Sequence, residues 1–164
     1  MTDPNLLQKA QRLFELAAAK NIKIVSVESC TGGLLAALIT QISGSSQIFE
    51  RGFVTYSNRA KIEDLGVNEQ ILQQFGAVSK EAAEQMAKGA VANSQADLSI
   101  AITGIAGPNS DNSKKPVGLV YIASFNDLNK KLIVKKFNFD GCRQQIRLLS
   151  VENAINILIS QIKQ

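Results

Sequence analysis

Residues 23–42 read KIVSVESCTGGLLAALITQI and hold the pattern that decides the fold of the chain. The segment 23–27 is short, apolar and rich in β-branched residues, which is typical of a buried strand. It runs into a turn of polar and glycine residues at 28–33, and then into an apolar helical stretch at 34–42. A strand, a turn and a helix in this order form the repeating unit of a layered α/β domain.

The same alternation continues on both sides of this unit. Asp3 and Pro4 mark a helix start, because aspartate caps the first turn and proline suits the first helical position. Apolar spacing predicts that this helix reaches Lys20, and Ser79 should cap an alanine-rich helix with acids in its early turns. The other expected elements are strands at 49–55, 98–103, 117–123 and 131–139, helical pieces at 60–65 and 69–75, and a last helix from about 140.

The last two predicted strands follow one another directly, with a turn at 126–127, so the sheet should be mixed. The sequence therefore predicts an α/β fold, a three-layer α/β/α sandwich around a mixed, mostly parallel sheet. Its 164 residues contain no linker, repeat or low-complexity tract, and we expect a single domain spanning 1–164. The polar segment Asn109–Lys115 should be a surface loop.

The composition excludes several classes of protein. The chain has no histidine, which rules out Ser-His-Asp and Cys-His catalysis and histidine-based zinc sites. Two cysteines, Cys30 and Cys142, are too few for a four-cysteine zinc site or a disulfide framework. A net charge of +4 with scattered lysines and 5% aromatic residues does not predict a nucleic-acid surface. With no signal segment or membrane span in the sequence, we expect a soluble cytoplasmic protein.

Two strand-to-loop junctions have the polar and glycine content of a ligand site, Glu28–Gly33 and Thr103–Pro108. In such sheets, ligands bind outside the carboxyl ends of the strands. Glycines there would let backbone N–H groups approach an anion, and the helix after Gly33 would add its positive dipole end. The alternative interpretation is a pair of ordinary tight turns. Neither junction is a P-loop, because no Gly-Lys-Ser/Thr follows.

A third candidate combines the turn at 44–46 with Tyr56 and Lys61. Without histidine, a serine nucleophile needs another base, and lysine is the known substitute. Such a lysine must be largely neutral, which requires burial or a neighbouring cation such as Arg59. Tyr56 would relay a proton or orient the amine. The alternative is a solvated lysine on a helix beside serines that cap a turn.

Arg143 and Cys30 are two further candidates. Arg143, near the start of the last helix, would bind phosphate through both arms of its guanidinium, or it is a surface arginine. Cys30 precedes a helix N-terminus, where the pKa of a thiol falls. Because no histidine is available as its partner, we favour a small buried residue over a nucleophile.

Six blocks of sequence together resemble the CinA C-terminal domain family, and they cover nearly the whole chain in order. They are VESCTGG (27–33), GSS (44–46), FERGFVTYSN (49–58) followed by Lys61, GAVS (76–79), TGIAGP (103–108) and KPVG (115–118). The pairing of ESCTGG with TYSN is the most specific feature. The chain is similar in particular to the single-domain nicotinamide-nucleotide amidases of this family, without the molybdopterin-binding-like domain of the long members.

This resemblance implies hydrolysis of the carboxamide of nicotinamide mononucleotide to nicotinate mononucleotide and ammonia, in pyridine nucleotide recycling. It implies no metal and no organic cofactor, a small-molecule partner and no nucleic acid or membrane, and a homo-oligomer (dimer or trimer). By the family match, Ser46 is the nucleophile and Lys61 its general base, with Tyr56 and Ser29 assisting and Arg143 binding substrate. The further substrate-binding positions are Thr31, Gly32, Gly33, Ser45, Thr103, Gly104 and Gly107.

The chain departs from the family pattern in two places. Relatives often carry a Gly-Gly pair where this chain has Asn109-Ser110-Asp111, and commonly an aspartate where it has Cys142, beside Arg143. Some members keep the fold with weak or no amidase activity. A nucleotide-binding module without turnover, linked to competence or DNA damage, is therefore the second hypothesis, and a structural oligomer assembled through apolar helix faces is the third.

Overall fold

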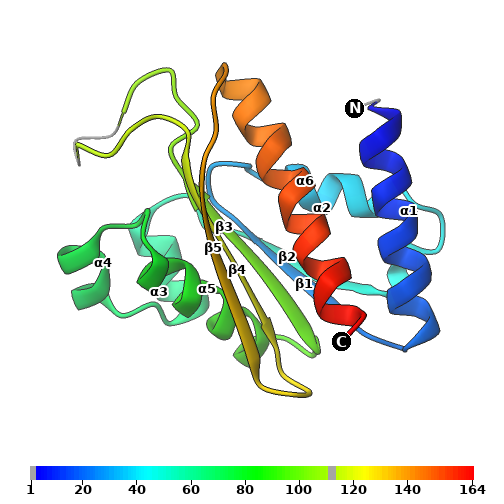
Figure 1. Ribbon diagram of the computed structural model, residues 1–164. Helices are drawn as coiled ribbons and strands as arrows, with labels where there is room; N and C mark the ends of the chain where they lie inside the picture. The colour runs from blue at the N-terminus through cyan, green and yellow to red at the C-terminus, as the bar shows by residue number, and fades with distance from the viewer. Residues whose placement is uncertain (1–2, 111–113) are drawn as a thin grey trace.

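The computed structural model describes residues 3–110 and 114–164 and contains a five-stranded sheet with helices on both faces (Figure 1). The strands are β1 (Ile24–Glu28), β2 (Phe49–Val54), β3 (Leu98–Gly104), β4 (Leu119–Asn126) and β5 (Lys131–Asn138). The helices are α1 (Pro4–Ala19), α2 (Leu34–Thr40), α3 (Asn58–Leu65), α4 (Glu69–Phe75), α5 (Lys80–Ala92) and α6 (Arg143–Ile162), with a 3₁₀ turn η1 (Ser45–Gln47). The predicted three-layer α/β/α sandwich is confirmed.

The sheet has the order β2-β1-β3-β4-β5. β1 pairs in parallel with β2 and β3, whereas β4 is antiparallel to both β3 and β5, so half of the pairings are parallel. "Mostly parallel" therefore overstated the parallel share of the pairings. The reason is that β3 is followed by a loop without a crossover helix in its described part, and β4 returns beside β3 in the opposite direction.

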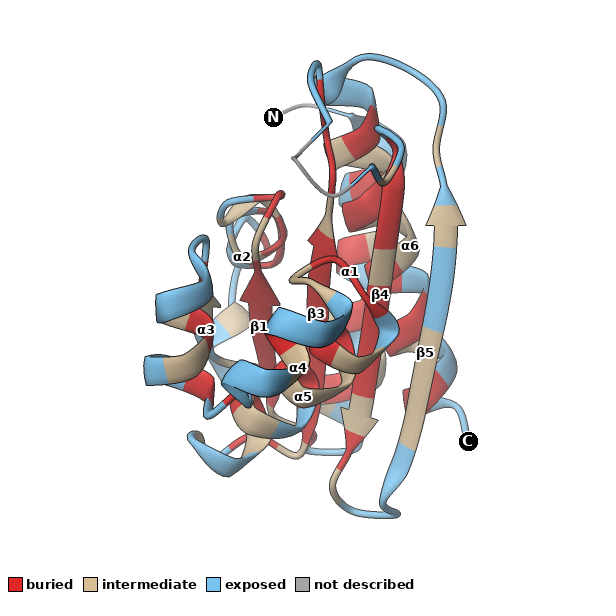
Figure 2. Cartoon of the chain, turned by 90° about the vertical axis from the view of Figure 1, so that its left-hand side faces the viewer, coloured by how far each residue is buried: buried red, intermediate tan, exposed pale blue. Residues whose placement is uncertain are grey.

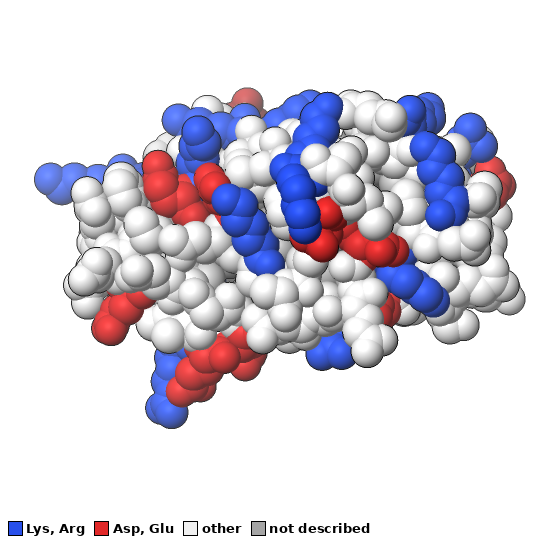
Figure 3. Space-filling model, turned by 90° about the horizontal axis from the view of Figure 1, so that it is seen from below, with Lys and Arg blue, Asp and Glu red and all other residues white. Residues whose placement is uncertain are grey.

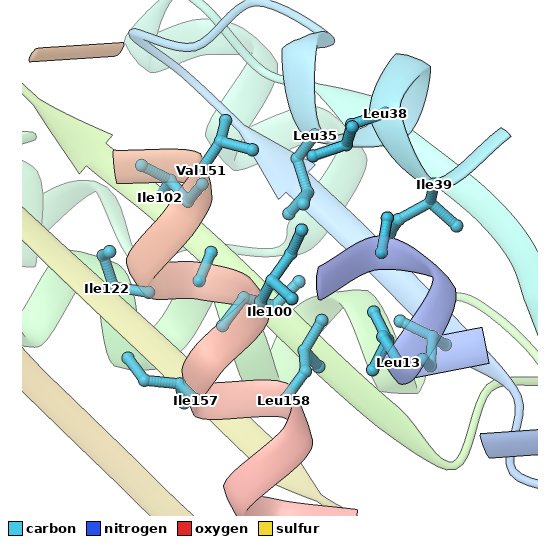
Figure 4. Packing of buried hydrophobic residues seen from close by; sticks show 14 of the residues in the cluster. Leu13, Leu35, Leu38, Ile39, Ile100, Ile102, Ile122, Val151, Ile157 and Leu158 are labelled. Carbon is cyan, nitrogen blue, oxygen red and sulfur yellow. The ribbon is translucent and has the colours of Figure 1, made fainter. Parts of the chain in front are cut away.

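One face of the sheet is covered by α1, α2 and α6 (Figure 1). Large aliphatic side chains of β3 and β4 point to this face and pack against the helices (Figure 4). Ile100, Ile102 and Ile122 are fully buried there, together with Leu13 of α1 and Leu158 of α6. This cluster is the larger of the two main cores and holds the central strands in place.

The opposite face carries small residues and is covered by α5, with α3 and α4 outside it. Ala101 and Ala123 of the sheet meet the alanines of α5, so that this helix approaches the strands closely. α3 packs in turn on α5 at Gly89, where a Cβ atom would lie 2.0 Å from the backbone oxygen of Leu65. This glycine therefore sets the position of α3, the helix that carries Lys61.

The predicted element boundaries hold to within two or three residues. Asp3 and Ser79 cap their helices as expected, through hydrogen bonds to Asn5 N and Ala82 N. The loop predicted at 109–115 is exposed at Asn109, and its residues 111–113 lie outside the described part of the chain. Central β1 and β3 are buried, whereas edge strand β5 has only intermediate and exposed positions (Figure 2).

The surface at the end of the sheet where β1 begins carries both positive and negative side chains (Figure 3). Figure 3 shows that face, with basic and acidic side chains interspersed among uncharged ones. Within residues 3–110 and 114–164, no helix is long and apolar enough to cross a membrane.

Substitution of Gly89 by alanine tests the close contact between α3 and α5. Alanine in a helix normally gains up to about 1 kcal/mol over glycine. Here the new methyl group would meet the Leu65 carbonyl, and overpacking of this kind costs roughly 1–3 kcal/mol. We expect G89A to unfold at lower urea concentration than the wild type, while the neighbouring exposed control K88A shifts by less than about 0.5 kcal/mol. A G89A variant as stable as wild type would show that α3 is free to move away.

Candidate functional site

A cavity of about 280 Å³ opens at the carboxyl ends of β1 and β3. Its polar lining comes from three parts of the chain: Ser29 after β1, the segment from Tyr56 to Lys61, and the loop after β3. Arg143, the first residue of α6, closes one side. The full lining is Ser29, Cys30, Tyr56, Lys61, Ala77, Val78, Thr103, Gly104, Ile105, Ala106, Gly107, Asn109, Ser110 and Arg143. The site therefore lies where open α/β sheets bind their ligands.

Lys61 is buried, with 1% of its surface exposed, although it belongs to a helix at the edge of the molecule. Its Nζ donates hydrogen bonds to the Ser29 Oγ at 3.1 Å and the Thr55 carbonyl oxygen at 2.8 Å, and more weakly to the Tyr56 carbonyl at 3.5 Å. Ser57 caps α3 through Ala60 N and so fixes the turn of helix from which Lys61 projects. The alternative of a solvated lysine is therefore wrong.

Burial lowers the pKa of Lys61 from its ordinary value of 10.5 to about 8. Arg59, which was considered as the cation that depresses this pKa, instead pairs with Glu63 at 2.6 Å and is 84% exposed. Desolvation of the ammonium is the cause, because the charged form loses its hydration in the cavity wall. A lysine of this kind is partly neutral near pH 8 and can accept a proton from the serine beside it.

Ser46 lies at the other end of the sheet. Its carbonyl accepts a hydrogen bond from Lys23 Nζ. The turn η1 that holds Ser46 leads into β2, and the Ile48 carbonyl before β2 accepts a hydrogen bond from Ile24 N at the start of β1. Lys23, which contacts Ser46, precedes β1, whereas Ser29, which contacts Lys61, follows β1. The two contacts are therefore separated by the length of this strand, on the order of 15–20 Å. Within one chain the pairing of Ser46 with Lys61 is therefore wrong, and Ser29 is the serine that Lys61 contacts.

Ser45 is likewise absent from the cavity lining and sits in η1. The GSS block at 44–46 turns the chain from α2 into β2, with Gly44 at φ 83°. It has no contact with the cavity at Ser29. The strand predicted at 49–55 was the available signal, because Ser46 precedes this strand whereas Lys61 follows it.

The N–H groups of the two glycines in the loop 28–33 are bonded within the chain, contrary to the expectation that they face a bound anion. The carboxylate of Glu28, which is completely buried, accepts hydrogen bonds from the backbone of Gly33, Leu35 and Ala36 at 2.9–3.1 Å. The N–H of Gly32 bonds to the Ser29 carbonyl. The start of α2 is thus closed by an internal anion, and the glycines at 32 and 33 serve this turn through φ values of 57° and 93°.

The loop after β3 does line the cavity, as the sequence predicted. Thr103 is buried and donates from its Oγ1 to the Ala77 carbonyl at 2.8 Å, which joins β3 to the wall before α5. Gly104 packs so closely on β4 that a Cβ would lie 2.7 Å from a methyl group of Val120. Gly107 has φ 83°, and its carbonyl accepts a hydrogen bond from Arg143. These three residues are brought together with Ser29 and Lys61.

Arg143 bridges two walls of the cavity. Its Nη1 donates to the Gly107 carbonyl at 2.7 Å and its Nη2 to the Tyr56 hydroxyl at 3.2 Å. The Tyr56 hydroxyl therefore faces Arg143, whereas Lys61 contacts only the Tyr56 carbonyl. Cys142, where relatives commonly have aspartate, is exposed at the N-cap of α6.

Cys30 is buried beside Ser29, and its burial raises the pKa of the thiol to about 11. The thiol is therefore protonated at neutral pH and is a poor nucleophile. The prediction of a small buried residue is confirmed.

Two roles were not predicted from the sequence, that of Glu28 in closing the start of α2 and that of Arg147. Arg147 Nη2 donates to the Thr31 carbonyl at 2.7 Å, and so ties α6 to the turn that carries Ser29. Its spacing of four residues from Arg143 was the available signal, because residues four apart share one face of a helix.

Comparison with known proteins agrees with this fold. The model of the CinA C-terminal domain matches residues 7–162. The nicotinamide-nucleotide amidohydrolase PncC of Escherichia coli (strain K12) is 42% identical over 164 residues, which cover 100% of this chain and 99% of that protein. The crystal structure of the competence/damage inducible protein CihA from Agrobacterium tumefaciens superposes with a TM-score of 0.95 at 40% identity, over 100% of this chain and 99% of that one.

Other relatives are longer. The CinA-like protein of Endomicrobium trichonymphae is 51% identical over 140 residues, which cover 85% of this chain but 32% of that protein. The chain spans about a third of the length of several of the curated relatives that it matches. The match of the domain model over nearly the whole chain, with full-length similarity to PncC, shows that the chain belongs to the CinA C-terminal domain family.

Proposed function

We propose that this chain is an amidohydrolase that converts the carboxamide of nicotinamide mononucleotide to a carboxylate and releases ammonia. The observation that carries the proposal is the 3.1 Å contact between Ser29 Oγ and the buried Lys61 Nζ inside the cavity. Full-length similarity to a relative named nicotinamide-nucleotide amidohydrolase supports the substrate. Pyridine nucleotide recycling, a cytoplasmic location and a dimer or trimer belong to the same proposal.

In this mechanism neutral Lys61 takes the proton of the Ser29 hydroxyl while Oγ attacks the amide carbon. The backbone N–H groups of Ala106 and Gly107, for which residues 3–110 and 114–164 supply no acceptor, are our candidates to hold the oxyanion. The carbon–nitrogen bond then breaks, and protonated Lys61 gives its proton to the departing ammonia. Water hydrolyses the resulting ester through the same lysine, which frees Ser29 and the product acid.

Tyr56 and Arg143 have a supporting role in this scheme. Because the tyrosine hydroxyl bonds to the guanidinium and not to the lysine, Tyr56 fixes Arg143 across the mouth of the cavity. Arg143 is thereby held where it contacts substrate. Neither group is needed for the proton transfer between Ser29 and Lys61.

The Ser29–Lys61 assignment is tested by ammonia release from purified protein given nicotinamide mononucleotide. We expect S29A and K61A to lose at least about 10³-fold in kcat, as loss of the nucleophile or its base does in other serine enzymes. The control S46A should keep activity within about twofold, because Ser46 lies at the other end of the sheet. Loss in S46A with retention in S29A would reverse the assignment. Ligand binding without turnover in the wild type would favour the non-catalytic binding module.

The pH dependence of kcat/KM tests Lys61 as the base. Only the neutral amine accepts a proton, and burial lowers its pKa to about 8. The rate should therefore rise about tenfold per pH unit below pH 8 and level off above it. A rate that keeps rising to pH 10 would indicate an ordinary solvated lysine, and a rate already constant at pH 6 would exclude Lys61.

The buried ammonium also lowers stability at neutral pH. Its pKa is about 8 in the folded chain but near 10.5 in the unfolded chain, so that the unfolded state holds the proton more tightly between these values. The resulting cost is complete below pH 8, is at most about 3 kcal/mol, and disappears as the pH rises to 10.5. We expect K61M to resist urea better than the wild type at pH 7 and to lose this advantage toward pH 10.5, whereas exposed K88M changes little. A variant that is less stable at every pH would contradict this.

A further inference from the structure

A second cavity of about 440 Å³ lies beside the first and shares Arg143 with it. It is formed between the start of α2 and the first turns of α6. Its lining residues are Leu34, Arg143, Gln144, Arg147 and Leu148. The only charges among these are the two guanidinium groups, so the cavity is suited to an anion.

Arg147 is half-buried and held by a single described contact, from Nη2 to the Thr31 carbonyl at 2.7 Å. Its Nε is buried and has no acceptor among the residues that the structure describes. Among the carboxylates of residues 3–110 and 114–164, none forms an ion pair with Arg143 or Arg147. Two like charges four residues apart on a helix repel each other. An anion between them would remove that repulsion and offset the desolvation of Arg147.

Several backbone N–H groups beside this cavity are already bonded within the chain. The N–H groups of Gly33, Leu35 and Ala36 are taken by Glu28, and that of Cys142 by the side chain of Gln145. Among the side chains that line this cavity, the two arginines are the charged donors, beside the uncharged amide of Gln144. We propose that this second cavity is the phosphate subsite of the enzyme and that Arg147 makes it selective for a phosphorylated over an unphosphorylated substrate; this rests on the proposed function.

The position of Arg147 suits a substrate that spans both cavities. Thr31, to which Arg147 is anchored, follows the proposed nucleophile Ser29 by two residues. Both Arg143 and Arg147 lower the pKa of the Cys30 thiol against the larger effect of burial, so their fields reach the first cavity. When the amide of the nucleotide lies at Ser29 in the first cavity, its phosphate would lie in the second cavity, beyond Arg143 and beside Arg147.

The selectivity is tested by comparing nicotinamide mononucleotide with nicotinamide riboside, which carries the same amide without phosphate. In R147Q we expect kcat/KM for the nucleotide to fall roughly ten- to a hundredfold, the effect of losing one charge-assisted contact. The riboside value should stay within about twofold, and R147K should recover part of the nucleotide rate. R12Q is the matched control, because Arg12 is an exposed arginine of α1 paired with Glu15. An equal loss for both substrates, or no loss for either, overturns the subsite.

A binding measurement separates this inference from the proposed reaction. Ribose 5-phosphate titrated by calorimetry into wild type and into R147Q needs no turnover. Weaker binding in R147Q, with a thermal midpoint like that of R12Q, supports the subsite even when no amide is hydrolysed. Equal affinity in the two proteins overturns it even when the amidase reaction is found.

Discussion

The carboxylate of Glu28 joins three parts of the structure that the site depends on. It ends β1, and its side chain accepts the first backbone N–H groups of α2, so the turn through Ser29 is held at both ends. Its carbonyl accepts the N–H of Thr55, and the Thr55 carbonyl in turn accepts a hydrogen bond from Lys61. A fully buried charge is stable in a protein only when it is satisfied in this way. The contact between Ser29 and Lys61 is thus the last link of a chain of hydrogen bonds that starts at one residue.

Much of the fold could be predicted from the sequence because its signals are local. The β-branched run at 24–27, the caps at Asp3 and Ser79 and the apolar spacing of the helices each act within a few residues. Pairing direction is different, since it depends on the connection between one strand and the next. The loop after Gly104 leads back along the sheet without a crossover helix in its described part, and β4 therefore runs antiparallel to β3.

The site could be predicted only in part, for a related reason. Predicted residues of the cavity lining meet because each lies at or follows the carboxyl end of a strand at the same end of the sheet, which topology predicts. Among them are Thr103 at the end of β3, Gly107 after β3, Tyr56 and Lys61 after β2, and Arg143 after β5. Ser46 precedes a strand and so lies at the wrong end of the sheet, although the turn that holds it looks like a catalytic one in sequence. The role of Glu28 could not be predicted, because a carboxylate beside a glycine turn can either bind a ligand or accept the N–H groups of the following helix. Burial decides between the two, and burial depends on the packing of the whole domain.

The absence of acidic side chains from the described lining of both cavities has a consequence for the end of the reaction cycle. The substrate amide of the proposed reaction is neutral, whereas the product carries a new carboxylate in a cavity that contains Lys61 and Arg143. Hydrolysis therefore increases the attraction between the enzyme and the molecule that it must release. Proton uptake by Lys61 strengthens this attraction further at the pH values where the lysine is charged. In the proposed reaction the cations of the site therefore hold the product acid more strongly than the substrate amide, and the acid must leave before the next substrate can bind.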